Sequence, residues 1–359
     1  MRVEDLDTPA LVVDLDRLEA NLERMAQYAR AHGLRLRPHT KTHKAPWIGQ
    51  RQLDLGAVGL TVAKSTEAEV MLAAGPKDLL VAYPVVGAPK LERLRPIAEQ
   101  LDLTIALDSL EAAEAISRAG LRVRVLVEMD VGLGRVGVRP EDVESLVRAV
   151  EALPGITWGG LAFYPGHIKQ GGEAGRKAIA ALSELVGGTV ESLRRAGLEP
   201  RVVSGGSTPT WNHSHEIAGM NEMRPGTYVF NDRNSVQCGS CAPEDCAAHM
   251  LVTVVSTARE GTIIIDAGSK TFSSDRYEDE CGVSFGAIAG APGAHFYKMN
   301  EEHGFVDTTA CERKFRVGEK LLVLMNHVCV AMNLAERVHG YRGGRVEKEW
   351  AVVARGKLQ

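Results

Sequence analysis

The chain has little excess charge of either sign and no long apolar run. Its 359 residues carry a formal net charge of −4, with 25% charged and 45% hydrophobic residues. Because there is neither a basic excess nor a charged tail, we expect no nucleic-acid partner. No apolar stretch approaches the roughly 20 residues of a membrane span, and residues 1–5 lack the apolar core of a secretory leader. We therefore expect a cytoplasmic protein that does not bind membranes.

Cysteine is absent from the first 237 residues of the chain. All six cysteines fall between residues 238 and 329. In a cytosolic chain of this length such cysteines are more often reduced or metal-linked than a disulfide scaffold. Cys238, Cys241 and Cys246 have the close spacing of a structural zinc site, with His249 as a fourth ligand. Ordinary packing of reduced thiols is the alternative, and we favour it.

The pattern of apolar segments predicts two domains of different type. Up to about residue 230, short apolar strands alternate with amphipathic helices. The expected strands are residues 10–14, 35–39, 59–62, 79–82, 103–107, 123–128, 160–162 and 201–204. About eight such units predict an α/β fold, a (β/α)8 TIM-type barrel.

The last third of the chain has a different pattern of residues. After about residue 246, β-branched segments separated by glycine turns predict a β-rich domain, a small barrel or sandwich. We place the barrel at residues 7–235 and the second domain at residues 1–6 plus 236–359. Residues 1–6 are expected to supply the first strand of the second domain.

A run of basic side chains interrupts the second expected strand. If that strand continues, alternation places four side chains on one face: Arg37, His39, Lys41 and His43. On an edge strand such residues simply face solvent, but in a buried parallel sheet they need a functional reason. Crowding by like charge and partial desolvation favour the neutral lysine amine, which attacks carbonyl carbons. Lys41 is therefore a candidate Schiff-base lysine, and His39 a second candidate catalytic residue.

These motifs resemble a known family. Residues 8–14 and 37–41, with later segments in the same order, are similar to the D-threonine aldolase and D-serine dehydratase group of pyridoxal 5′-phosphate (PLP) enzymes. That group has the alanine-racemase-like fold, and the likeness extends from Asp7 to Gly356. The resemblance implies that Lys41 holds PLP covalently and that the barrel is the PLP-binding domain.

Two glycine turns are candidates for binding the cofactor phosphate. Residues 204–210 follow an expected barrel strand, and residues 224–228 follow about twenty residues later. Backbone N–H groups exposed by such turns bind phosphate, and hydroxyl groups add donors. Turns need glycine in any case, so the argument depends on their position and on the match to the family's phosphate site. The candidate residues are Gly205, Gly206, Ser207, Thr208, Gly226, Thr227 and Tyr228.

Two further loops carry candidate residues. Residues 128–137 resemble the glycine–arginine loop of alanine-racemase-like barrels, which implies that Arg135 lies near the phenolic oxygen of the cofactor. The alternative for Arg135 is a solvent-exposed side chain in a flexible loop. Tyr164, after the next strand, is placed to flank the cofactor ring or the substrate. His167 is either a catalytic base or an ordinary loop histidine.

The segment His327-Val328-Cys329 is a candidate metal site. On an extended segment, the spacing of two residues points both side chains to one side. Imidazole with thiolate favours zinc before manganese or magnesium, and two protein ligands leave positions open for water and substrate. Because short motifs of this kind arise often by chance, the resemblance to the family's metal pair carries the assignment.

The resemblance implies a divalent-metal-activated, PLP-dependent lyase acting at Cβ of β-hydroxy-D-amino acids. Family dehydratases have His-x-Cys at the metal motif, as here, whereas the best-known D-threonine aldolases have His-x-Asp. The loop at residues 163–167 and the short chain instead favour the aldolases. We favour a D-threonine aldolase, which forms glycine and acetaldehyde. The alternatives are a D-serine dehydratase, an amino acid racemase and a non-enzymatic PLP carrier, and a homodimer is expected.

Overall fold

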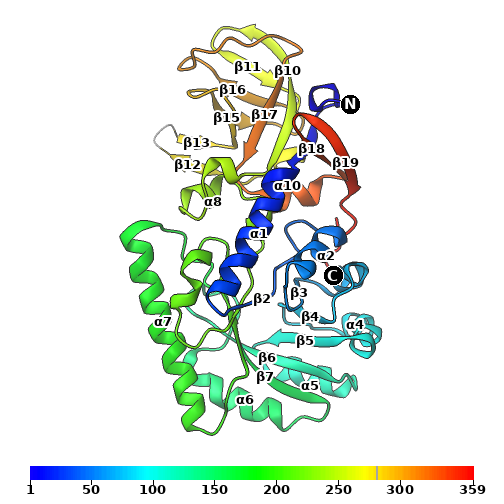
Figure 1. Ribbon diagram of the computed structural model, residues 1–359, viewed down its shortest axis with the longest axis vertical. Coiled ribbons are helices and arrows are strands. Elements are labelled where there is room, and N and C mark those ends of the chain that lie inside the picture. The colour runs from blue at the N-terminus through cyan, green and yellow to red at the C-terminus, as the bar shows by residue number, and fades with distance from the viewer. Residues whose placement is uncertain (280–281) are drawn as a thin grey trace. The chain divides into compact units, whose positions relative to one another are not determined.

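The computed structural model describes residues 1–279 and 282–359, so Cys281 lies outside the described residues. The chain forms two compact units. We call Glu23–Gly226 with Gly356–Gln359 the barrel unit, and Met1–Leu22 with Thr227–Arg355 the β unit. Each unit has its own sheet (Figure 1).

The barrel unit is built on an eight-stranded parallel sheet. In spatial order its strands are β2 (Arg35–Leu36), β9 (Glu222–Met223), β8 (Val202–Gly205), β7 (Ile156–Phe163), β6 (Val123–Met129), β5 (Asp102–Leu107), β4 (Asp78–Val81) and β3 (Leu60–Val62). A bridge between His39 and Thr61 joins the segment after β2 to β3, so that the sheet closes on itself. Consecutive strands contribute one buried layer, formed by Leu80, Ala106, Leu126, Ala162 and Val202.

Helices follow the strands and lie outside the barrel (Figure 1). They are α2 (Pro46–Asp54), α3 (Ser65–Met71), α4 (Ala88–Gln100), α5 (Leu110–Arg118), α6 (Val143–Glu151) and α7 (Gly172–Arg195). In α6, Val143, Leu146, Val147 and Val150 are buried, which is the three-to-four spacing of a helix with one apolar face. No helix in residues 1–279 and 282–359 is long and apolar enough to cross a membrane.

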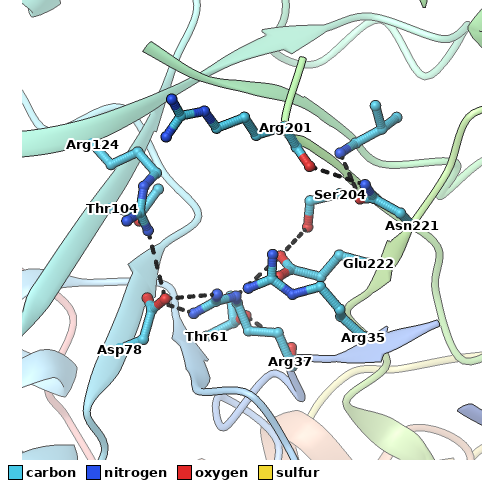
Figure 2. A network of polar contacts seen from close by, with 11 residues as sticks. Arg35, Arg37, Thr61, Asp78, Thr104, Arg124, Arg201, Ser204, Asn221 and Glu222 are labelled. Carbon is cyan, nitrogen blue, oxygen red and sulfur yellow. Dashed lines mark hydrogen bonds and ion pairs between the residues drawn. The ribbon is translucent and has the colours of Figure 1, made fainter. Parts of the chain in front are cut away.

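An ion-pair network fills the amino-terminal end of the barrel (Figure 2). Arg37 lies between Asp78, whose Oδ1 is 2.7 Å from its Nη1, and Glu222, whose Oε1 is 3.0 Å from its Nε. Asp78 and Glu222 are the first residues of β4 and β9. Ser204 also donates a hydrogen bond to Glu222. The buried charges of Arg37 and Glu222 therefore have partners of opposite sign.

The β unit contains a nine-stranded sheet. Its strands, in spatial order, are β11 (Thr262–Ile265), β16 (Gly304–Asp307), β15 (His295–Met299), β14 (Gly286–Ile288), β17 (Lys320–Met325), β10 (Ala248–Arg259), β1 (Ala10–Asp14), β18 (Arg337–Arg342) and β19 (Arg345–Ala351). Because β11 also pairs with β10, the strands from β11 to β10 form a closed ring. A separate antiparallel two-stranded sheet is formed by β12 (Tyr277–Asp279) and β13 (Gly282–Ser284).

Two expectations about strands are wrong. The segment Ala10–Asp14 is not the first barrel strand, since β1 pairs with β10 and β18 in the β unit. Residues 1–6 hold a short 3₁₀ helix, Val3–Asp5, and no strand. The eighth barrel strand is instead β9, which has two residues, one of them a glutamate. An apolar run shows that a strand is buried, but it does not identify the neighbours with which the strand pairs.

Candidate active site

Lys41 lies in a turn at the carboxyl end of β2. The backbone pairs with its neighbours as far as His39, whose N–H donates to the carbonyl of Pro225. It then turns, with the N–H of Lys44 donating to the carbonyl of Thr40. The expected alternation therefore stops at His39 and does not reach Lys41 or His43. Arg37, also expected on that face, is instead part of the network at the amino-terminal end.

Three sequence-predicted residues come together above the carboxyl ends of the strands. The Lys41 ammonium is 5.7 Å from the centroid of the Tyr164 ring, and the Arg135 guanidinium is 4.9 Å from it. Tyr164 follows β7 and Arg135 lies in the loop after β6. In (β/α)8 barrels the carboxyl ends of the strands carry the catalytic groups. These three residues are therefore candidates for the active site of the barrel.

The Asp130 carboxylate makes most of the side-chain hydrogen bonds to the loop that carries Arg135. Asp130 Oδ1 accepts hydrogen bonds from the N–H groups of Gly132, Leu133 and Gly134, at 3.0 to 3.1 Å. The His167 ring lies against this loop, because a Cβ on Gly132 would be 3.5 Å from its Nε2. Arg135 itself is exposed, at the end of this hydrogen-bonded turn.

His39 is the neutral member of the cluster. Burial lowers its pKa well below the usual value, and the positive charges of Lys41 and Arg224 lower the pKa further. At neutral pH the imidazole is therefore uncharged. His43 is fully buried, and burial lowers its pKa to about 3.

Sequence reasoning missed two charged residues at this end of the barrel. The buried Arg224 guanidinium, after β9, donates to the carbonyls of Phe163 at 2.9 Å and Ser204 at 3.2 Å. Glu128, near the end of β6, is also buried, and burial raises its pKa although Arg224 and Arg135 oppose this. The signal was in the sequence, since an ionisable residue at the carboxyl end of a barrel strand is a functional candidate.

The first glycine turn follows β8 directly. Its Ser207 and Thr208 are buried, and the Ser207 N–H donates to Thr210 Oγ1 at 3.1 Å. Gly205 packs so closely on Phe163 that a Cβ would lie 2.1 Å from the ring, and Gly206 has a φ of +79°. Neither position accepts a larger residue without strain.

The second glycine turn follows β9. Because β8 and β9 are adjacent and parallel, their carboxyl ends meet at one edge of the sheet. A Cβ on Gly226 would lie 3.0 Å from the carbonyl oxygen of His39, so this turn also approaches the Lys41 segment closely. Thr227 and Tyr228, the remaining predicted residues, begin the β unit, in the 3₁₀ helix Thr227–Val229.

The predicted metal motif lies at a strand-to-helix junction of the β unit. His327 is extended, with φ −138° and ψ 119°, and directly precedes α10 (Val328–Leu334). Cys329 is therefore in the first turn of a helix, and the expected extended geometry of the motif is wrong beyond His327. Thr227 Oγ1 lies 3.8 Å from Cys329 Sγ.

Two acidic side chains, those of Cys329 and Asp232, interact with the imidazole of His327. The Cys329 thiolate raises the pKa of His327 to about 11, against the effect of burial, and Asp232 adds to the rise. Within residues 1–279 and 282–359, no three His, Cys, Asp or Glu side chains gather as metal ligands. This also removes support from a zinc site at Cys238, Cys241, Cys246 and His249.

Comparison with known proteins identifies both units. The family model for the N-terminal domain of alanine racemase matches residues 13–234, and that for a putative serine dehydratase domain matches residues 247–341. D-threonine aldolase from Arthrobacter sp. is 33% identical over 98% of this chain and 93% of its own. This chain belongs to the D-threonine aldolase and D-serine dehydratase family of PLP enzymes. The family and the fold inferred from the motifs are confirmed.

Relatives of this family member include both kinds of lyase. D-threo-3-hydroxyaspartate dehydratase from Delftia sp. is 36% identical over 90% of this chain and 91% of its own. The crystal structure of D-threonine aldolase from Filomicrobium marinum superposes with a TM-score of 0.92 and 32% identity, covering 100% of this chain and 98% of that one. Aldol cleavage and dehydration thus both occur among relatives of similar identity.

Proposed function

We propose that this protein is a divalent-metal-activated, PLP-dependent lyase that acts at Cβ of β-hydroxy-D-amino acids, as a D-threonine aldolase. The observation that carries the proposal is the grouping of Lys41, Tyr164 and Arg135 at the carboxyl end of the barrel. The matched relatives at 33% and 36% identity, an aldolase and a dehydratase of β-hydroxy-D-amino acids, support the substrate class.

The residues present fit PLP. Lys41 supplies an amine for the aldehyde carbon, and the closely packed glycine turns with buried Ser207 and Thr208 suit a phosphate. We propose that Gly205, Gly206, Ser207, Thr208, Gly226, Thr227 and Tyr228 hold the phosphate. Arg135 would contact the phenolic oxygen and Tyr164 would lie beside the ring. When bound, PLP supplies an electron-accepting ring for the bonds at Cα.

Proton transfer in either reaction needs a neutral base. His39 is a candidate because its lowered pKa keeps the imidazole uncharged at neutral pH, so that it would pass a proton on rather than retain it. Lys41, within the same turn, is the candidate to take the proton at Cα in a dehydration. His167 is a further candidate through its place against the loop that carries Arg135.

The residues of the β unit also fit a divalent cation. His327 and Cys329 offer one imidazole nitrogen and one thiolate, a donor pair that favours zinc before manganese or magnesium. Such a cation supplies Lewis acidity, which lowers the pKa of a bound hydroxyl group. Support comes from a relative, because a cysteine-to-alanine variant of D-threo-3-hydroxyaspartate dehydratase has been solved in a metal-free form, with a TM-score of 0.87 to this chain.

Dehydration is the second candidate reaction. It is favoured by the cysteine at the metal motif and by the 36% identity to a dehydratase. Aldol cleavage is favoured by the loop at residues 163–167 and by the TM-score of 0.92 to a D-threonine aldolase.

For either reaction we propose a homodimer, which light scattering after size-exclusion chromatography tests directly.

Product analysis separates the candidate reactions. The purified protein with PLP and Zn²⁺ or Mn²⁺ is incubated with D-threonine, D-serine and 3-hydroxy-D-aspartate, with L-threonine as the control. An aldolase forms glycine with acetaldehyde from D-threonine and with glyoxylate from 3-hydroxy-D-aspartate. A dehydratase forms ammonia with 2-oxobutanoate, pyruvate or oxaloacetate. Ammonia without glycine would replace the aldolase by the dehydratase, and no turnover with bound PLP would contradict the lyase.

A further inference from the structure

Asp232 has four hydrogen bonds to two different parts of the β unit. It is buried, and it directly precedes α8 (Arg233–Gln237). Its Oδ1 accepts from Ser235 N at 2.9 Å and from Ser235 Oγ at 2.8 Å. Its Oδ2 accepts from the Val328 N–H at 3.1 Å and pairs with Nδ1 of His327 at 2.9 Å. One oxygen thus caps α8, and the other accepts hydrogen bonds from the metal motif.

The second oxygen fixes the tautomer of His327. A carboxylate can only accept hydrogen bonds, so Nδ1 of His327 carries the proton that it shares with Asp232. A cation would then displace the other ring proton and bind Nε2, which is the nitrogen that Asp232 leaves available. Carboxylates placed behind metal-binding histidines orient the ring in this way and increase its basicity.

The same oxygen also fixes the backbone of the motif. By accepting from the Val328 N–H, Asp232 holds the first residue of α10, directly before Cys329. On the other side of His327, the Asn326 amide donates to the carbonyls of Asp275 at 2.9 Å and Ser284 at 2.8 Å. The segment from Asn326 to Val328 is therefore held at both ends.

We infer that Asp232 is the positioning residue of the metal site, which sets the tautomer of His327 and its orientation relative to Cys329. This inference rests on the proposed binding of a cation by His327 and Cys329. Capping of α8 does not account for the arrangement, because the cap needs only Oδ1 and the contacts to the metal motif use Oδ2. Nothing in the local sequence marks the pair, since the two residues are 95 positions apart.

The test is the metal affinity of an Asp232→Asn variant. Asparagine keeps one oxygen for the α8 cap, but it turns an amide donor toward the N–H of Val328 and Nδ1 of His327. We expect Zn²⁺ and Mn²⁺ to bind about 10- to 100-fold more weakly, measured by competition with a chromogenic chelator. In the Co²⁺-loaded protein, the thiolate-to-cobalt absorption band should weaken or shift, whereas the PLP content should not change.

Ser235→Ala is the matched control. It removes one hydrogen bond to Oδ1 and none to Oδ2, so it should lower stability slightly and leave the metal affinity and the cobalt spectrum unchanged. If Asp232→Asn does not fold, Asp232→Ser retains a capping hydroxyl without the carboxylate and should show the same loss of affinity. Wild-type affinity in a folded Asp232 variant, or an equal loss in Ser235→Ala, would overturn the inference.

The alanine variants of His327 and Cys329 separate this inference from the proposed function. Each should lose metal binding altogether. If they bind metal as the wild type does, the proposed metal site is wrong, whatever Asp232→Asn shows. If they lose the metal while the Asp232 variants keep it, only the role of Asp232 is wrong.

Discussion

The two ends of the barrel both hold buried charge, but they differ in how that charge is paired. At the amino-terminal end, Arg37 lies between Asp78 and Glu222, and its side chain is 3% exposed (Figure 2). At the carboxyl end, Lys41 and Arg135 both lie near the Tyr164 ring. Burial and the positive charges of Lys41 and Arg224 lower the pKa of the nearby His39, which is therefore neutral. Pairing at the amino-terminal end avoids the cost of a buried charge without a partner, whereas an excess of cations at the other end suits an anionic cofactor.

The comparison also explains why Arg37 and Lys41 differ in role although they are four residues apart. Backbone pairing of the strand continues through Arg37 and ends at His39. Arg37 therefore points into the barrel toward residues at the start of other strands, whereas Lys41 lies in the turn that follows. Sequence alternation alone places both side chains on one face.

The largest expected effect is that of Lys41→Ala. This variant should lose turnover and the visible absorption of lysine-bound PLP, because it lacks the amine that holds the cofactor. Absorption spectra and borohydride reduction followed by mass spectrometry measure the loss. Lys64→Ala is the control, since the Lys64 ammonium lies 3.6 Å over the Tyr83 ring and should not be needed. A reducible PLP adduct in Lys41→Ala would exclude Lys41 as the attachment site.

Removal of the metal should abolish turnover and leave the cofactor in place. The proposed cation is held by residues of the β unit, whereas the proposed covalent attachment is in the barrel unit. After dialysis against a chelator, we expect the PLP absorption to persist and activity to return with Zn²⁺ or Mn²⁺. Undiminished turnover in protein shown to be metal-free by mass spectrometry would disprove the metal requirement.

Loss of the amino-terminal network should reduce stability rather than cofactor binding. Arg37→Met leaves the half-buried Asp78 and the buried Glu222 without their shared partner, so the free energy of unfolding should fall by about 3–5 kcal/mol. Urea unfolding measures this, and the folded fraction should still bind PLP.

Arg124→Met is the matched control for that network. Its Nη1 is 3.6 Å from Asp78 Oδ2 and its side chain is 35% exposed, so the loss should be about 0–1 kcal/mol. If both variants lost the same free energy of unfolding, burial of an ion pair would not decide how much its loss destabilises the protein.

The smallest expected effect is the acid dependence that His43 contributes. Its pKa is about 3 in the folded protein, against an ordinary value of 6.5, so below pH 6.5 the unfolded chain binds a proton that the folded chain does not. This contribution to stability is present above about pH 6.5 and falls with pH by about 1.4 kcal/mol per unit. In His43→Gln, urea unfolding between pH 7 and 4.5 should show a correspondingly shallower loss. Parallel curves for the two proteins would contradict this account.

The sequence by itself was enough for the family, the fold class and the proposed cofactor. Alternation of short apolar segments with amphipathic helices is a local property, and it predicted the barrel correctly. The motifs around Lys41, Ser207 and Cys329 are also local, because each depends on residues within a few positions of one another. These are the features that a single chain segment can encode.

Only the tertiary structure decided which distant residues meet. It assigned β1 to the β unit and closed the barrel with β9, which has only two residues and carries a glutamate. It paired Arg37 with Asp78 and Glu222, and His327 with Asp232. The physical reason is that a buried or charged segment needs a partner, and the sequence shows this need. Which residue becomes the partner depends on how the whole chain folds back on itself.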